Sequence, residues 1–157
     1  MTLAAVSDSG PLIHLGEIDS LELLSAFDEL LVPETVYAEI EAGGVPSGLV
    51  DISYELVEVD GKPRETDELD AGESAAIAVA TERDLTLLTD DLAARKSASG
   101  AGVDVHESVG VIALAHARGY LNVDEAASSM RALQRETSLF VTDAVIERGI
   151  ELLNETR

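Results

Sequence analysis

Short apolar runs alternate along the chain with stretches in which apolar side chains recur at helical spacing. Runs of strand length occupy residues 3–6, 30–32, 56–59, 85–88 and 103–105. Strands that alternate with helices form βαβ units with right-handed crossovers, so this pattern predicts an α/β fold with a parallel sheet.

Helical segments are predicted between and after the apolar runs. They cover residues 12–15, 21–27, 33–42, 75–80 and a stretch ending near 99, and three more helices follow residue 108. Thr142 and Asp143 are typical of the start of the last helix. The polar segment 62–69 predicts a loop, and residues 45–54 give no clear prediction. Nothing resembles a linker or a repeat, so we expect one domain over residues 1–157.

Length and residue usage narrow the class of protein. A chain of 157 residues fits one compact domain, and none of its apolar runs approaches the ~20 residues that span a bilayer. The N-terminus carries no basic segment typical of a signal peptide. The chain has no cysteine, which excludes disulfides and thiolate metal sites. We therefore expect a cytoplasmic protein without a membrane partner.

The charge balance is unusual. Asp and Glu number 31 against ten Lys and Arg, giving a formal net charge of −21, and no Lys or Arg precedes Lys62. Nucleic-acid-binding proteins usually carry the opposite charge. Either the chain avoids nucleic acid, or it works in a cytoplasm of very high salt, where acidic surfaces keep proteins soluble. The sequence favours a halophilic origin, because the Debye length falls to ~3 Å in 1 M salt and repulsion is then short-ranged.

Five acidic side chains are placed where an α/β protein binds ligands. Asp8 follows the first predicted strand, and Asp90 and Asp91 follow the fourth, while Glu39 and Glu73 lie on helices that come after strands. Ligands of open α/β sheets bind at the carboxyl ends of the strands. Clustered carboxylates suit Mg²⁺ or Mn²⁺, and a pair of such ions can hydrolyse a phosphodiester.

Each of these acids also has a structural interpretation. Glu73 completes a capping box with Asp70 as its N-cap, and Glu39 could be an exposed helix residue. One of the two neighbouring aspartates could cap the next helix while the other faces the pocket. For Asp8 a functional role is favoured over a structural one, because this acid follows an apolar strand and precedes an apolar turn.

Other polar side chains give weaker indications. His14, His106 and His116 lack the spacing of metal ligands and are interpreted as packed or surface residues. Ser9 could bond a substrate phosphate or a metal-bound carboxylate, or simply stabilise its turn. Arg95 could contact a substrate phosphate or pair with one of the many nearby acids.

Four blocks of sequence, in order, resemble the PIN-domain superfamily. In the first block Asp8 ends the predicted strand, in the second Glu39 lies on the helix after a Val-Pro pair, and the third contains a Leu-Asp-x-Gly-Glu signature that is similar to a PIN-like subgroup. The blocks are residues 6–13, 32–40, 69–80 and 87–95, and residues 109–121 and 139–142 extend the likeness toward the C-terminus.

This resemblance implies one PIN-like domain, a Rossmann-like three-layer α/β/α sandwich with a mostly parallel central sheet. It also implies Mg²⁺ or Mn²⁺ binding and ribonuclease activity on RNA. Many members are VapC-type toxins of type II toxin–antitoxin modules, inhibited by a small antitoxin protein, and many form homodimers.

Residue by residue, the resemblance implies an acidic quartet with a specific set of roles. The catalytic residues would be Asp8, Glu39, Glu73 and Asp91. The metal ligands would be drawn from Asp8, Glu73, Asp90 and Asp91, with Asp90 as the alternative to Asp91. Most PIN nucleases have Asp where this chain has Glu73, and the longer side chain could shift the metal or leave a single well-formed site.

Two other function classes compete with a nuclease. A PIN-like scaffold without activity would serve as a dimerising or partner-binding module. A receiver domain or a dehalogenase-type phosphatase fits poorly. The first needs its acidic pair after the first strand, and the second needs an acid at the position of Gly10.

Overall fold

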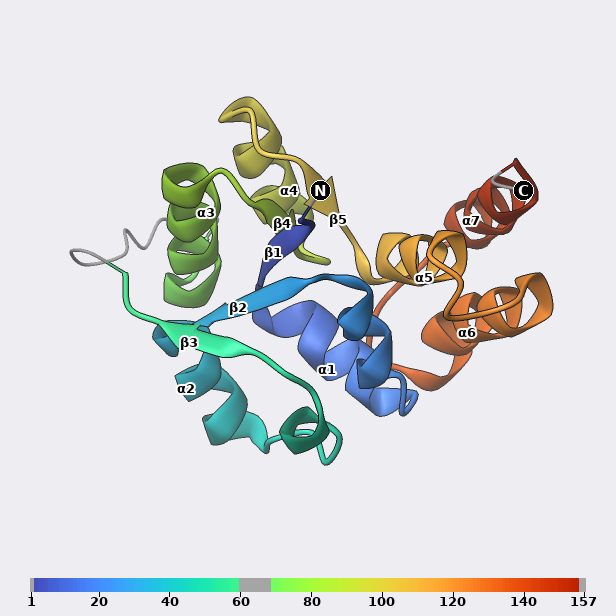
Figure 1. The fold of residues 1–157 in the computed structure, drawn as a ribbon, viewed down its shortest axis with the longest axis horizontal. Helices are drawn as coiled ribbons and strands as arrows, with labels where there is room; N and C mark the ends of the chain where they lie inside the picture. Colours follow the sequence, from blue (N-terminus) through green and yellow to red (C-terminus); the bar gives the residue numbers. More distant parts are fainter. Residues whose placement is uncertain (1, 60–68, 156–157) are drawn as a thin grey trace.

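The computed structural model describes residues 2–59 and 69–155, and its centre is a parallel sheet (Figure 1). Five strands pair in the order β3-β2-β1-β4-β5, and every pairing is parallel. Their bounds are β1 Ala4–Ser7, β2 Glu29–Pro33, β3 Glu55–Val57, β4 Thr86–Leu88 and β5 Val105–His106. From β1 the chain adds β2 and β3 on one side of the sheet, and then β4 and β5 on the other side. The strand order therefore switches between β1 and β4, the position at which such folds bind ligands.

Alternate side chains of the strands enter two separate cores. Ala5 and Leu88 belong to one buried cluster, whereas their neighbours Val6 and Leu87 belong to the other. Both faces of a parallel sheet are covered by its crossover helices, and this explains why the strands read as continuous apolar runs rather than as alternating ones.

Helices form a layer on each face of the sheet. The face of Ala5 is covered by α1 Ser9–Glu17, the 3₁₀ helix η1 Leu21–Ala26, α2 Glu34–Gly43 and the short η2 Leu49–Asp51. The opposite face is covered by α3 Ala71–Arg83 and α4 Leu92–Gly100. The three-layer α/β/α sandwich predicted from the sequence is therefore confirmed (Figure 1).

Three C-terminal helices lie together beside β5 (Figure 1). They are α5 Ser108–Ala117, α6 Val123–Glu136 and α7 Asp143–Glu155, and they extend the core that contains Ala5. Thr142 caps α7 as expected, since its hydroxyl accepts a hydrogen bond from Val145 N at 3.3 Å. Within the described residues, no helix combines the length and apolar character that a membrane crossing requires.

The structure departs from the sequence prediction at two elements. Residues 21–26 form a 3₁₀ helix, and the backbone is already extended at Phe27, ahead of β2. The last strand begins at Val105 rather than at Val103, whose amide bonds Ala98 O and so still completes the end of α4. The loop predicted at 62–69 lies outside the described residues except for Leu69.

Candidate active site

Asp8 and Thr89 are neighbours at the carboxyl ends of the two central strands. In the β1–β4 pairing Ser7 lies opposite Leu88, and each of these residues comes directly before one of the two polar ones. Asp8 N donates to Leu88 O at 2.9 Å, which continues the ladder by one residue. The chain then turns into a helix after each strand, so both polar side chains face the end of the sheet.

Asp8 is a buried carboxylate with only a 4% exposed surface. One oxygen accepts from Ser9 N at 2.8 Å as the N-cap of α1, and the other accepts from the Thr89 hydroxyl at 2.8 Å. Burial raises the pKa of Asp8 to about 6, although these two hydrogen bonds lower it and the charges of Asp70 and Asp91 raise it further. A buried carboxylate with so few donors readily accepts a proton or a cation.

The first turn of α3 brings two more carboxylates to the same edge. Asp70 accepts from Glu73 N at 2.8 Å, and the Glu73 side chain reaches back to Asp70 N at 3.4 Å, forming the capping box predicted from the sequence. The second oxygen of Glu73 is buried and has no hydrogen-bond partner among the described residues. Burial, with Asp91 and Asp70 beside it, raises the pKa of Glu73 to about 8.

Glu39 reaches the start of α3 from the neighbouring helix α2. Its carboxylate accepts from Gly72 N at 3.0 Å. A Cβ at position 72 would lie 2.5 Å from one Glu39 oxygen and 2.6 Å from the other, so this approach requires glycine. Burial, with Asp70 and then Asp8 as negative neighbours, raises the pKa of Glu39, while the bond from Gly72 lowers it.

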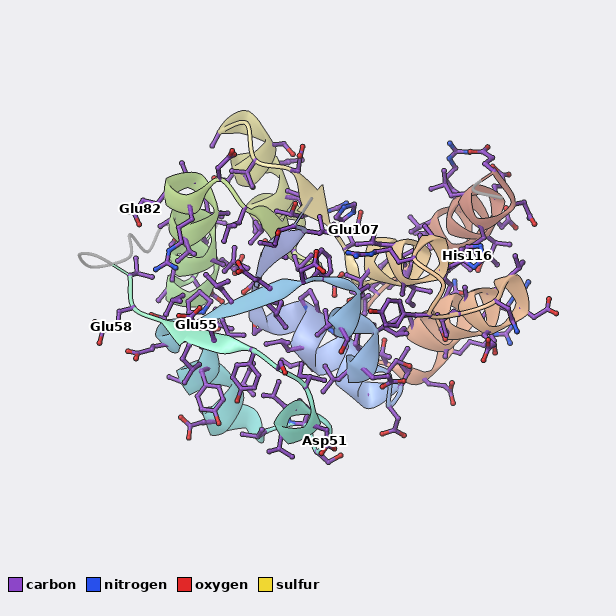
Figure 2. All side chains as sticks on the ribbon, viewed as in Figure 1. Asp51, Glu55, Glu58, Glu82, Glu107 and His116 are labelled. Atoms are coloured by element: carbon purple, nitrogen blue, oxygen red, sulfur yellow. The ribbon has the colours of Figure 1, made fainter. Side chains whose placement is uncertain are left out.

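A pocket of about 250 Å³ opens between these elements. Its walls carry four free or capping carboxylates and one hydrogen-bonded Asp–His pair, and neither Lys nor Arg is among the described residues that line it. The lining residues are Asp8, Ser9, Gly10, His14, Asp70, Glu73, Asp90, Asp91 and Leu139. Other acids, such as Asp51, Glu58 and Glu82, lie exposed at the periphery (Figure 2), so the pocket is a distinct cluster and not part of an even acidic surface.

Comparison with known families identifies this arrangement. The family model DUF3368, described as a PIN domain, matches residues 4–155. The chain belongs to this family of PIN domains. A similar solved structure is a PilT N-terminus domain protein from the hyperthermophilic archaeon Sulfolobus solfataricus P2, with a TM-score of 0.61 and 20% identity, covering 72% of this chain and 93% of that one. No curated protein matches the chain.

PIN domains are commonly nucleases and generally use divalent metals. In this PIN domain, the ligand atoms suit such an ion: they are carboxylate oxygens, one of them buried without a hydrogen-bond donor, and neither Lys nor Arg is among the described lining residues to offset their charge. Within residues 2–59 and 69–155, however, no three Asp, Glu or His side chains are arranged closely enough to hold a metal ion. The chemistry of the site therefore fits a metal, but coordination requires its side chains to move.

Asp90 has a different environment from the other acids of the PIN domain pocket. Its side chain is 4% exposed, and both of its oxygens are occupied. Ser108 donates to it twice, from its amide at 2.7 Å and its hydroxyl at 2.6 Å, and His14 Nδ1 lies 2.7 Å from Oδ2. Asp90, the alternative to Asp91 as a metal ligand, joins α1, the end of β4 and α5 through these bonds, which leave its carboxylate less free to bind an ion than that of Asp91.

The remaining predicted residues are divided between the pocket and its surroundings. Asp91 lines the pocket and also caps α4, accepting from Ala94 N at 2.8 Å. Ser9 lines it as well. Glu39 and Arg95 are not among the lining residues, and Arg95 forms an ion pair with Glu107. The interpretation of Arg95 as a residue that pairs with an acid thus describes its position better than a phosphate contact does.

The sequence interpretation misses two polar residues of this pocket. The sequence predicts only a capping role for Asp70 and a packed or surface position for His14. A signal existed for Asp70, because the N-terminus of a crossover helix lies at the carboxyl edge of a parallel sheet, where its N-cap faces the ligand site. The partner of His14 is 76 residues away, and no local pattern indicates that pairing.

Proposed function

We propose that this PIN domain is a metal-dependent endoribonuclease whose acidic pocket binds Mg²⁺ or Mn²⁺ and hydrolyses RNA phosphodiester bonds. The observation that carries the proposal is the convergence of Asp8, Glu73 and Asp91 on one pocket without a basic partner. Such an arrangement is unfavourable for an empty ionised site and favourable for one that holds a divalent cation.

The raised pKa values of the pocket support the same conclusion. Asp8, with a pKa of about 6, and Glu73, with a pKa of about 8, hold protons more tightly than free carboxyl groups do. A bound cation would displace those protons and neutralise the repulsion between the side chains. When bound, it would supply a Lewis acid for the phosphoryl oxygens and an activated water.

The residues of the chain have separate roles in this proposal. Asp8 and Asp91 are the ligands, and Glu73 is either a third ligand or, once the cation has displaced its proton, the base that accepts a proton from the attacking water. Thr89 positions two of them, because its hydroxyl donates to Asp8 and accepts from Asp91 N at 3.2 Å. Glu39 adds negative charge from behind α3, and Ser9 offers a hydroxyl to the substrate phosphate.

The direct test combines metal binding and cleavage in one set of proteins. Mn²⁺ is titrated calorimetrically into the wild type and the Asp8→Asn variant at low and at molar KCl, and single-stranded RNA is then incubated with each protein and the same metal. We expect wild-type binding and cleavage that EDTA abolishes, and we expect neither from Asp8→Asn. Asp51→Asn is the matched control, because Asp51 is an exposed acid far from the pocket lining.

Each outcome distinguishes this proposal from its rival. Metal binding without cleavage of any RNA would favour an inactive PIN-like scaffold that binds a partner. Cleavage that persists in Asp8→Asn or in EDTA would show that a contaminating nuclease causes the activity. An absence of Mn²⁺ and Mg²⁺ binding to the wild type would exclude the proposed site.

We further propose, on the resemblance alone, that the protein is a cytoplasmic, homodimeric toxin of a type II module, inhibited by a small antitoxin. The net charge of −21 supports a halophilic source for it. Induction in a host cell should arrest growth, and Asp8→Asn should remove the arrest. Growth that continues with active wild-type enzyme would exclude the toxin role while leaving the nuclease assignment intact.

A further inference from the structure

The loop between α6 and α7 carries an exposed aromatic side chain directly after a residue of the pocket lining. Leu139 lines the pocket, and Phe140 follows it with 89% of its surface exposed. Among the described residues it is the most exposed large hydrophobic side chain, ahead of Val50 at 80%. The only other Phe of the chain, Phe27, is buried. Single exposed apolar residues are common on proteins, so the position of Phe140 matters more than its exposure.

Hydrogen bonds fix the loop on both sides of Phe140. Gln134 Nε2 donates to Val141 O at 3.1 Å and to Asp143 at 2.7 Å. On the other side, the Ser138 hydroxyl donates to Glu17 at the end of α1 at 2.8 Å. The exposed ring is therefore presented by an ordered segment, and a ligand that contacts it pays little to organise the loop.

The charge of the surroundings limits what kind of contact can hold a nucleic acid here. The pocket lining contains neither Lys nor Arg, and the chain as a whole carries a net charge of −21. The usual source of affinity, the pairing of phosphates with basic side chains, is thus missing from the lining. Stacking of a base on an aromatic ring needs no positive charge, persists in high salt and requires that the base be unpaired.

We propose that Phe140 is a stacking residue that holds an unpaired nucleobase of the RNA substrate at the edge of the acidic pocket. This inference rests on the proposed nuclease function and adds a residue that binds the substrate. Because Phe140 directly follows Leu139 of the pocket lining, a nucleotide stacked on its ring would lie within reach of the pocket.

The test measures binding and cleavage of a fluorescein-labelled oligoadenylate by Phe140→Ala, Phe140→Trp and the wild type. Anisotropy is recorded at several KCl concentrations with EDTA, which prevents cleavage. We expect Phe140→Ala to weaken binding roughly 5- to 100-fold, as expected for the loss of one stacked base, and Phe140→Trp to retain it. The dependence on salt should not change, because no charge is altered. In cleavage assays KM should rise while kcat stays constant.

Two controls separate stacking from a general effect of an exposed apolar side chain. Val50→Ala removes a similarly exposed hydrophobic residue from η2 and should bind like the wild type. An abasic oligomer of the same length should bind the wild type and Phe140→Ala equally. Equal affinity of the two proteins for oligoadenylate, or an equal loss with the abasic oligomer, would overturn the proposal.

The failure of this inference can be told apart from the failure of the proposed function. Cleavage by the wild type with an unchanged KM in Phe140→Ala refutes the stacking role alone. Binding that depends on Phe140 without any cleavage refutes the nuclease alone. If Phe140→Ala instead converts a dimer to a monomer in sedimentation experiments and leaves RNA binding unchanged, the residue is a subunit contact and the proposal is wrong.

Discussion

The two adjacent aspartates after β4 both line the pocket, but their surroundings differ, and we call these surroundings the wall of Asp90 and the wall of Asp91. The wall of Asp90 is fully hydrogen-bonded, because Ser108 and His14 provide three donors to its two oxygens. The wall of Asp91 and Glu73 is crowded with carboxylates, and one buried oxygen of Glu73 has no partner among the described residues. One wall is built like a protein core, and the other is built like a binding site.

This difference shows why identical residue types in adjacent positions need not share a function. A buried carboxylate with three donors stabilises the fold as long as it stays ionised. Carboxylates that share a pocket and have few donors repel one another, and the folded state tolerates this repulsion by holding protons or a cation. The comparison predicts that mutations on the two walls will separate activity from stability.

The largest expected effect is on activity, from Asp91→Asn. Loss of a charged ligand should lower RNA cleavage at least about 100-fold, the upper end of what loss of an outer-shell partner costs a metal site. Stability should hardly change, because Asn is as good an N-cap as Asp and can still accept from Ala94 N. Rate measurements with saturating Mn²⁺, together with urea unfolding, check both parts. If Asp91→Asn lost much stability but kept its activity, Asp91 would be a structural residue and not a metal ligand.

The second expected effect is a fall in the stability of the metal-free protein as pH rises. Asp8 has a pKa of about 6 in the folded state against an ordinary value of 3.8, and Glu73 has about 8 against 4.5. The folded protein therefore binds protons more tightly, so the stabilisation is complete below about pH 4 and is lost as pH rises toward 8. For Asp8 the difference between its folded and ordinary pKa corresponds to at most about 3 kcal/mol.

Urea unfolding in EDTA across this pH range measures the slope. Repulsion among the many exposed acids gives a slope of the same sign, so the wild type alone does not decide the matter. Glu73→Gln removes one titrating group and should flatten the curve between pH 6 and 8, whereas Glu82→Gln, at an exposed position of the same helix, should not. Identical slopes for all three proteins would contradict the raised pKa of Glu73 in the folded protein.

A third expected effect is a loss of stability in Asp90→Asn. The amide cannot accept all three hydrogen bonds that the carboxylate accepts from Ser108 and His14, and a buried donor left without a partner costs about 1–3 kcal/mol. Thermal unfolding compares Asp90→Asn with Asp91→Asn, because both variants carry the same substitution at neighbouring positions. Equal stability of the two variants would mean that the hydrogen-bonded wall contributes nothing special to the fold.

The smallest expected effect on stability comes from Gly72→Ala. The new methyl group would displace the Glu39 carboxylate from the start of α3, while alanine is favoured over glycine in a helix by roughly 0.5–1 kcal/mol. We expect a net change in stability below about 1 kcal/mol and a lower cleavage rate. Gly100→Ala is the control, because a Cβ there meets nothing within 4 Å. An unchanged RNA cleavage rate in Gly72→Ala would show that Glu39 does not contribute to catalysis.

Much of the fold could be predicted because its determinants are local. The apolar runs mark the strands, and the capping box of Asp70 and Glu73 marks the start of α3 within four residues of sequence. Predictions failed where tertiary contacts decide the conformation. Gly102, in a left-handed conformation, turns the chain so that Val103 N still bonds the preceding helix, and this delays β5. No periodicity of side chains contains that information.

The candidate site could be predicted only in part, for a related reason. The position of Asp8 at the end of a strand follows from the order of apolar residues alone. The different fates of Asp90 and Asp91 do not, because they depend on His14 and Ser108, which lie 76 and 18 residues from Asp90. Sequence order tells which carboxylates reach the edge of the sheet, and the three-dimensional neighbours decide which of them keep free oxygens.

The hydrogen bond between Thr89 and Asp8 has a consequence for how the chain folds. It joins residues 81 positions apart, across the pairing of β1 with β4, and most of the other strands and helices lie between them in sequence. Contacts of such long range form slowly, since the intervening loop must close first. The nascent or partly folded chain therefore holds Asp8 in water as an ordinary acid. The acidic pocket comes into existence only with the native topology, and any cation that binds there binds the finished fold.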